Sequence, residues 1–197
     1  MKKKFFIIIF LIFAFTQKSF GYSSDPKQFI TEIVNEAKSI LVDTNTKEFK
    51  STKLSEMALR TVDIKGVAYY SLGNYRKSLK DGQLEEYLRL FEKYFLKSFT
   101  SRLTDYSDPK INVVSTEVIN DKYTIVKSVL LATDKRPEVK IEWRVYTKNP
   151  DKPLIRDLII EGLSLARTQK EEFASVIETN NGDINKLFIT LKEFTAK

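Results

Sequence analysis

Residues 155–166 read IRDLIIEGLSLA, an apolar run that contains the charged side chains Arg156, Asp157 and Glu161. In a regular strand alternate side chains share a face, so Asp157 and Glu161 are expected on one face and Arg156 on the other. Gly162 favours a bend, and Ser164 is a residue type that caps helices. The stretch therefore predicts a last strand over residues 154–161, followed by a turn into a closing helix.

Three further stretches upstream alternate between apolar and polar residues, as half-buried strands do. They are residues 111–119, 123–132 and 138–147. The connections between them are short, and Asn120-Asp121 favours a hairpin. The pattern predicts a four-stranded antiparallel sheet with one face covered and one face nearer to water.

The rest of the chain shows the 3.6-residue period of helices. The predicted helices are residues 26–41, 48–60, 63–72 and 81–103 before the strands, and two closing helices that start near Ser164 and Asp183. The helix over 81–103 carries an aromatic stripe. Such a stripe usually packs in a core, but some of its side chains are also candidates to line a cavity. The predicted fold class is α+β, a four-stranded antiparallel sheet packed with helices around an apolar cavity.

The N-terminus has the three parts of a secretory signal peptide. Lys2, Lys3 and Lys4 precede an apolar run from Phe5 to Phe15, and small residues at positions 19 and 21 suit a cleavage site. Eleven apolar residues at ~1.5 Å each span only about half of a ~30 Å hydrocarbon core. We therefore predict a signal peptide over residues 1–21 and a single periplasmic domain over residues 22–197.

Composition excludes several chemistries. The chain has no His and no Cys, which removes zinc sites of the usual kind, Ser-His-Asp triads and thiol nucleophiles. Removal of residues 1–21 takes away four lysines and no acid, which leaves 29 basic and 26 acidic residues and a net charge of +3. This weak and interspersed charge does not indicate nucleic-acid binding.

Asp157 and Glu161 are the candidate acid/base pair if the protein is an enzyme. A separation of four residues along a strand is ~13 Å, which is too far for two carboxyls to act on one reacting bond. We therefore interpret them as structural groups, predict no catalytic residue, and keep as alternatives an enzyme acting on a small hydrophobic ligand and a lipoprotein carrier or chaperone.

The order of motifs resembles the MlaC family, the toluene-tolerance proteins that are auxiliary components of a phospholipid ABC transporter. The resemblance covers residues 29–194 and is most specific at Asp157-x-x-x-Glu161-Gly162-Leu163-Ser164. Other matching elements are Leu72-Gly73-Asn74-Tyr75, Arg102-Leu103-Thr104-Asp105-Tyr106, Phe173, Gly182 and Leu187-x-x-x-Leu191.

The resemblance implies a monomeric periplasmic carrier that holds a phospholipid by its acyl chains and moves it between the outer and inner membranes. It implies no enzymatic activity and no cofactor besides the bound phospholipid. The implied partners are an inner-membrane complex of permease, ATPase and MCE-domain protein, and an outer-membrane lipoprotein associated with a porin.

A carrier of this kind needs an apolar cavity with an open mouth. The candidate lining residues are Tyr70, Phe91, Phe95, Phe99, Val129, Leu131, Trp143, Val145, Leu158, Ile160, Leu163, Phe173 and Ile177. Ordinary core packing is the alternative for each of them. The candidate contacts to a headgroup or a partner are Arg76, Lys77, Arg102 and Lys170. A solvated helix surface is the alternative for these basic residues.

Overall fold

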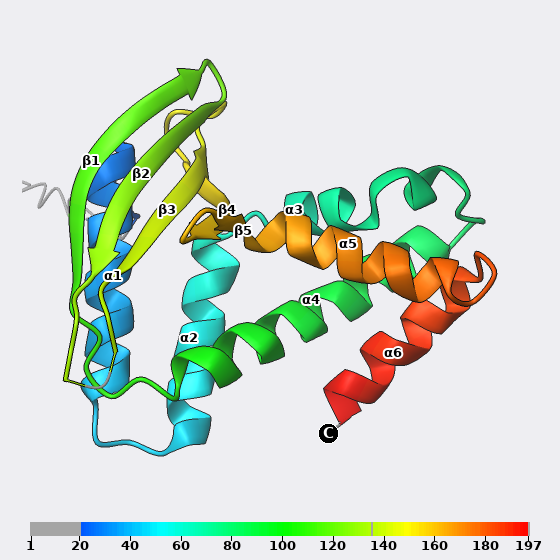
Figure 1. Cartoon of the computed structure of the whole chain (residues 1–197), viewed down its shortest axis with the longest axis horizontal. Coiled ribbons are helices and arrows are strands. Elements are labelled where there is room, and N and C mark those ends of the chain that lie inside the picture. The colour runs from blue at the N-terminus through cyan, green and yellow to red at the C-terminus, as the bar shows by residue number, and fades with distance from the viewer. Residues whose placement is uncertain (1–20, 135, 197) are drawn as a thin grey trace, which may run out of the picture.

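A computed structural model describes residues 21–134 and 136–196. Four helical segments and a 3-10 turn precede the strands, and two helices follow them (Figure 1). The helices are α1 (Pro26–Val42), α2 (Lys47–Thr61), α3 (Ile64–Leu72), α4 (Gln83–Leu103), α5 (Leu165–Glu178) and α6 (Ile184–Ala196), with the 3-10 helix η1 at Gly73–Lys77. The predicted helices are confirmed, with boundaries that differ by a few residues. The predicted signal peptide lies outside the described residues, apart from Gly21.

The sheet is an antiparallel meander in the order β1-β2-β3-β4-β5. Its strands are β1 (Ile111–Asn120), β2 (Tyr123–Leu130), β3 (Val139–Tyr146), β4 (Leu154–Ile160) and β5 (Leu163–Ser164). The prediction of four strands was wrong by one. After the bend at Gly162, Leu163 and Ser164 pair back onto Ile160 and Ile159 before α5 begins. A two-residue strand is too short to show the alternation of apolar and polar residues, so these two residues were predicted as part of the turn.

The regular alternation predicted for β4 was also wrong. Arg144 pairs with Asp157 and Val145 pairs with Ile155, so Arg156 is an extra residue in a β-bulge. A bulge shifts the facing of the strand by one residue. Ile155 consequently shares a face with Leu158, and Arg156 and Asp157 both come to the opposite side of the sheet.

Two core clusters hold the molecule together. In one, α1 and α2 pack on one face of the sheet, where Phe29, Ile30 and Leu54 meet Val126 and Val145. In the other, α3, α4, α5 and α6 pack on one another at the far end of the molecule (Figure 1). Helix α4 contacts α2 as well as α3 and α6, and therefore runs from one cluster to the other.

Tyr87 lies at the centre of the helical cluster and is fully buried. Its ring contacts Phe91, Phe173 and Phe188, and its hydroxyl donates to the carbonyl oxygen of Ala68 at 3.0 Å. Burial raises the pKa of the Tyr87 hydroxyl well above its usual value. The hydroxyl is therefore a neutral donor that fixes α4 against α3.

Short polar side chains begin several of the helices, and Ser164 does so as the sequence predicted. Asp25 accepts from the N–H of Gln28, Asp63 from Gly66, and Ser164 from Arg167. Each cap satisfies an N–H group that has no partner inside its helix. Asn181 and Gly182 have positive φ angles after α5, the left-handed conformation that is common where helices end.

Gly66 in α3 allows a close approach between this helix and the sheet. An added Cβ would lie 2.5 Å from Oδ2 of Asp63 and 3.0 Å from Nε of Arg156. Alanine usually stabilises a helix interior by ~0.5–1 kcal/mol relative to glycine. We expect Gly66→Ala instead to lower the free energy of unfolding by about 1–3 kcal/mol through overpacking, measured by urea denaturation. Ser55→Ala in α2 is the control, and equal stabilisation of both variants would contradict the expectation.

Candidate ligand-binding site

An apolar pocket of about 220 Å³ lies between α4, α5 and the middle of β3 and β4. Phe91, Phe95 and Phe99 project into it from α4, Trp143 from β3 and Leu158 from β4. Spacings of four residues put the three phenylalanines on one side of α4. The bulge in β4 places Leu158 opposite Trp143 on the face that meets this helix.

The three phenylalanines form a stack that leads from the core to the pocket. The ring centroids of Phe91 and Phe95 are 6.3 Å apart, and those of Phe95 and Phe99 are 5.9 Å apart with nearly parallel planes. Phe91 is 1% exposed, whereas Phe95 and Phe99 are only partly buried. Trp143 donates through Nε1 to Oγ of Ser128 at 2.8 Å, which fixes the indole in the pocket wall. The pocket therefore has an aromatic wall with a rigid inner end.

Polar side chains form one rim of this pocket. The Tyr94 hydroxyl donates to Oε1 of Gln169 at 2.7 Å, and Nε2 of Gln169 donates to Oε2 of Glu172 at 3.1 Å. Burial and the nearby Glu172 carboxylate raise the pKa of Tyr94, and the positive charge of Arg102 acts in the opposite direction. Tyr94, Gln169, Glu172 and Arg102 all line the pocket. An apolar chamber with a charged rim suits an amphiphilic ligand.

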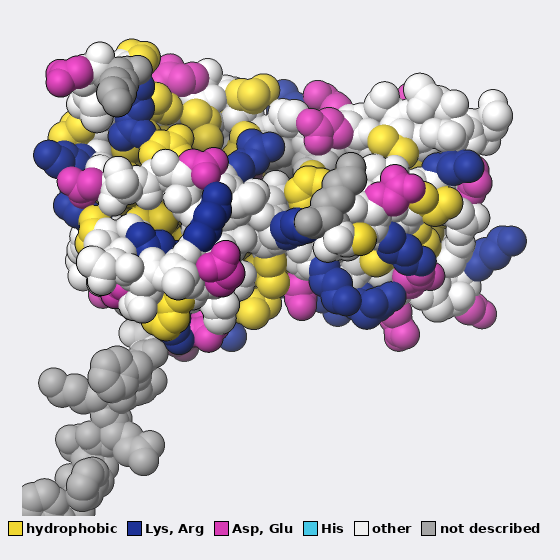
Figure 2. Space-filling model, turned by 90° about the horizontal axis from the view of Figure 1, so that it is seen from below, with side chains coloured by type: hydrophobic (Ala, Val, Ile, Leu, Met, Phe, Trp, Pro, Cys, Tyr) yellow, Lys and Arg dark blue, Asp and Glu magenta, His cyan; other side chains and the backbone are white. Residues whose placement is uncertain are grey.

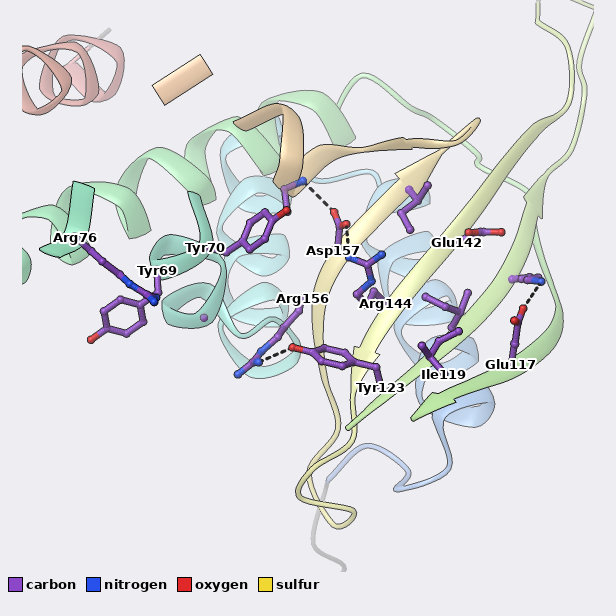
Figure 3. A pocket seen from close by; sticks show the side chains of 15 residues that line it. Tyr69, Tyr70, Arg76, Glu117, Ile119, Tyr123, Glu142, Arg144, Arg156 and Asp157 are labelled. Atoms are coloured by element: carbon purple, nitrogen blue, oxygen red, sulfur yellow. Dashed lines mark hydrogen bonds and ion pairs between the residues drawn. The ribbon is translucent and has the colours of Figure 1, made fainter. Parts of the chain in front are cut away.

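A second and larger groove, of about 740 Å³, lies between α3 and the other face of the sheet (Figure 3). Its lining is charged. Lys127 pairs with Glu117 at 2.7 Å, and Arg144 pairs with Asp157 at 3.4 Å. Desolvating these pairs against an acyl chain would be costly. The groove is therefore a poor candidate for hydrocarbon.

Arg156, Asp157 and Ala166 line both cavities and so form the partition between them. Arg156 contacts Asp63 through two nitrogens at 2.6 and 2.7 Å. It also donates to the Tyr123 hydroxyl at 2.8 Å (Figure 3). Its guanidinium also lies 3.5 Å from the ring centroid of Tyr146. Partial burial lowers the pKa of Arg156, but the hydrogen bonds to Tyr123 and Asp63 outweigh it, and the pKa is raised.

Asp157 holds the start of α5 against β4. Its side chain is 2% exposed, accepts from Oγ of Ser164 at 2.6 Å and from the N–H of Ala166 at 2.9 Å, and meets Arg144. Glu161 lies in the bend, directly before Gly162, is exposed, and accepts from the N–H of Lys140. Glu161 lines neither cavity, so the two carboxylates do not meet in one pocket.

The structure brings part of the predicted lining together. Phe91, Phe95, Phe99, Trp143 and Leu158 line the apolar pocket, and Tyr70 lines the polar groove. The other predicted residues line neither cavity: Val145, Phe173 and Ile177 are buried in the two core clusters, Val129, Leu131 and Ile160 are partly buried, and Leu163 is exposed. Contact of any of these residues with a ligand stays a prediction.

The four predicted basic contacts are separated in the structure. Arg102 lines the apolar pocket, and Arg76 lines the polar groove. Lys170 lies 5.6 Å from the ring centroid of Tyr70, and Lys77 is exposed at the end of η1. On the face drawn in Figure 2, Lys and Arg side chains are mixed with Asp and Glu, and apolar side chains surface mainly over the sheet end.

Sequence reasoning placed Phe173 and Ile177 of α5 in the lining and missed the face of α5 that lines the pocket. Leu165, Thr168, Gln169 and Glu172 follow the i, i+3, i+4, i+7 pattern of one helix face and all line it. The signal was present in the spacing. It was overlooked because three of the four residues are polar, and the prediction considered only apolar positions.

Residues 21–134 and 136–196 contain neither a candidate membrane-spanning helix nor a candidate metal-binding cluster. No helix there is both long and apolar enough to cross a membrane. No cluster of three or more acidic, His or Cys side chains there could hold a metal ion.

The fold and site define a class of protein: an α+β domain in which an antiparallel sheet and helices enclose an apolar pocket with a charged rim. Residues 28–193 match the family model described as MlaC protein, and the chain belongs to the MlaC family. The predicted family resemblance is thereby confirmed. One solved structure matches this chain with a TM-score of 0.70 and 20% sequence identity. The match covers 85% of this chain and 94% of the solved chain. It is the phospholipid-binding protein from Ralstonia solanacearum in complex with a phospholipid, and at this identity the likeness shows a shared fold.

Proposed function

We propose that this chain is a periplasmic phospholipid carrier that holds acyl chains in the apolar pocket between α4 and the β3–β4 end of the sheet. The observation that carries the proposal is the aromatic wall of Phe95, Phe99 and Trp143, whose partly buried side chains line a pocket at the edge of the core. Membership of the MlaC family and the phospholipid in the Ralstonia protein of the same fold support it.

An acyl chain exposed to water has a large unfavourable free energy, which an apolar pocket removes. Each methylene removed from water contributes ~0.8 kcal/mol, so one chain of about sixteen carbons would cost on the order of 12 kcal/mol if exposed. The pocket of about 220 Å³ is smaller than the roughly 300–1,000 Å³ of typical small-molecule sites. We infer that it widens on loading, at the place where the two core clusters meet.

The other parts of the proposal follow from the same role. Residues 1–21 direct export and are removed, and residues 22–197 act as a monomeric carrier. The carrier exchanges lipid with an inner-membrane permease, ATPase and MCE-domain complex and with an outer-membrane lipoprotein and porin. It performs no chemistry and uses no cofactor besides its lipid, and Asp157 serves to hold β4 against α5.

Native mass spectrometry tests the proposal on mature protein purified without detergent. We expect an added mass of ~700 Da that organic extraction identifies as phospholipid, because an exposed acyl chain is so unfavourable. A protein that stays empty and also takes no lipid from vesicles would contradict the proposal. A bound lipopeptide in place of phospholipid would instead support a lipoprotein carrier.

A further inference from the structure

The rim of the apolar pocket carries two opposite charges without an ionic partner. In the described part of the chain, Arg102 at the end of α4 has no ion pair, hydrogen bond or ring contact. Glu172 on α5 accepts only the neutral Gln169 amide. Both residues are exposed and both line the pocket. An unpaired cation and an unpaired anion on one rim can each bind the opposite charge of a ligand.

Tyr94 and Gln169 line the same pocket as these two charges. The Tyr94 hydroxyl donates to Gln169, and Gln169 donates to Glu172, so the carboxylate is oriented by a chain of two hydrogen bonds. Arg102 and Glu172 line the same pocket as this hydrogen-bonded pair. The two charges are therefore held on one rim by α4 and α5.

We propose, resting on the phospholipid-carrier function above, that this rim selects zwitterionic headgroups with a terminal primary ammonium, such as phosphatidylethanolamine. The Arg102 guanidinium takes the phosphate, for which its forked N–H groups are suited. The Glu172 carboxylate accepts hydrogen bonds from the ammonium. An anionic headgroup such as phosphatidylglycerol keeps the first contact and loses the second.

Other cations near the site are already engaged. Lys97 donates to the carbonyl oxygen of Thr195 and lies 5.9 Å from the Phe194 ring centroid. Arg144 and Arg156 pair with Asp157 and Asp63 on the side of the polar groove. Arg102 is thus the cation of the pocket lining that is free to meet a phosphate.

A competition experiment tests the selection. Mature protein is loaded from vesicles of equal parts dioleoyl phosphatidylethanolamine and dioleoyl phosphatidylglycerol, and both bound lipids are quantified after extraction. Wild type is expected to bind the ethanolamine lipid in excess. Glu172→Gln should lower the ethanolamine-to-glycerol ratio about threefold, because an exposed charge contact is worth a few-fold in affinity. Arg102→Gln should lower retention of both lipids together.

Glu171→Gln and Arg89→Gln are matched controls, because these exposed residues of α5 and α4 line neither cavity. A ratio unchanged by Glu172→Gln, with normal loading, overturns the headgroup proposal and leaves the carrier function standing. A wild-type protein that takes up neither lipid overturns both. A ratio shift of equal size in Glu171→Gln also overturns it, since the effect would then be a general surface charge effect.

Discussion

Phe95→Glu is expected to reduce phospholipid loading at least about tenfold while the protein remains folded. The Phe95 ring lines the apolar pocket and is only partly buried. A carboxylate there must lose hydration against an acyl chain, at a cost of several kcal/mol, but can reach water when the pocket is empty. Lipid per protein after exposure to vesicles measures the loss, and circular dichroism reports the fold.

Lys93→Glu is the control, because Lys93 is exposed on the same helix and lines neither cavity. It should load normally. Phe95→Leu, which keeps an apolar side chain, should keep at least half of the loading. Normal loading of folded Phe95→Glu would show that the ring belongs to the core of the helical cluster and that acyl chains lie elsewhere.

Asp157→Ala is expected to lower the free energy of unfolding by about 3 kcal/mol. The substitution leaves the buried N–H of Ala166 without its acceptor and removes a carboxylate from the start of α5. Asp157→Asn keeps one acceptor oxygen but loses the charge, and should lose about half as much. Urea denaturation of the three proteins measures the order.

Glu161→Gln is the matched control on the same segment. Glu161 is exposed, so this change should cost less than about 0.5 kcal/mol. A loss below about 1 kcal/mol for Asp157→Ala would contradict the role of Asp157 in joining β4 to α5.

The alternation of 138–147 and the period of 81–103 were strong enough to predict the sheet, the long helix and their contact. What the period could not reveal was the bulge at Arg156. An extra residue in a strand leaves no mark on composition, and it exchanges the faces of every residue beyond it. Leu158 lies on the pocket-facing side of β4, whereas Arg156, predicted on the face opposite Asp157, lies on the same side as Asp157.

The division between core and pocket was also beyond the sequence. Phe173 and Phe95 are both aromatic residues on helix faces, yet one is buried in the helical cluster and the other lines the pocket. The difference depends on which neighbour covers each ring, and that is decided by the packing of α3, α5 and α6. Helical spacing alone shows which residues point inward, not what lies opposite them.

Photo-crosslinking with a phospholipid that carries a diazirine at the middle of an acyl chain tests the central claim most directly. After loading and irradiation, tryptic peptides with the lipid adduct are mapped by mass spectrometry. We expect adducts on α4 around Phe95 and Phe99 and on β3 at Trp143, because these side chains line the apolar pocket. Adducts confined to the polar groove, at Ile119, Ile125 or Ile159, would contradict it.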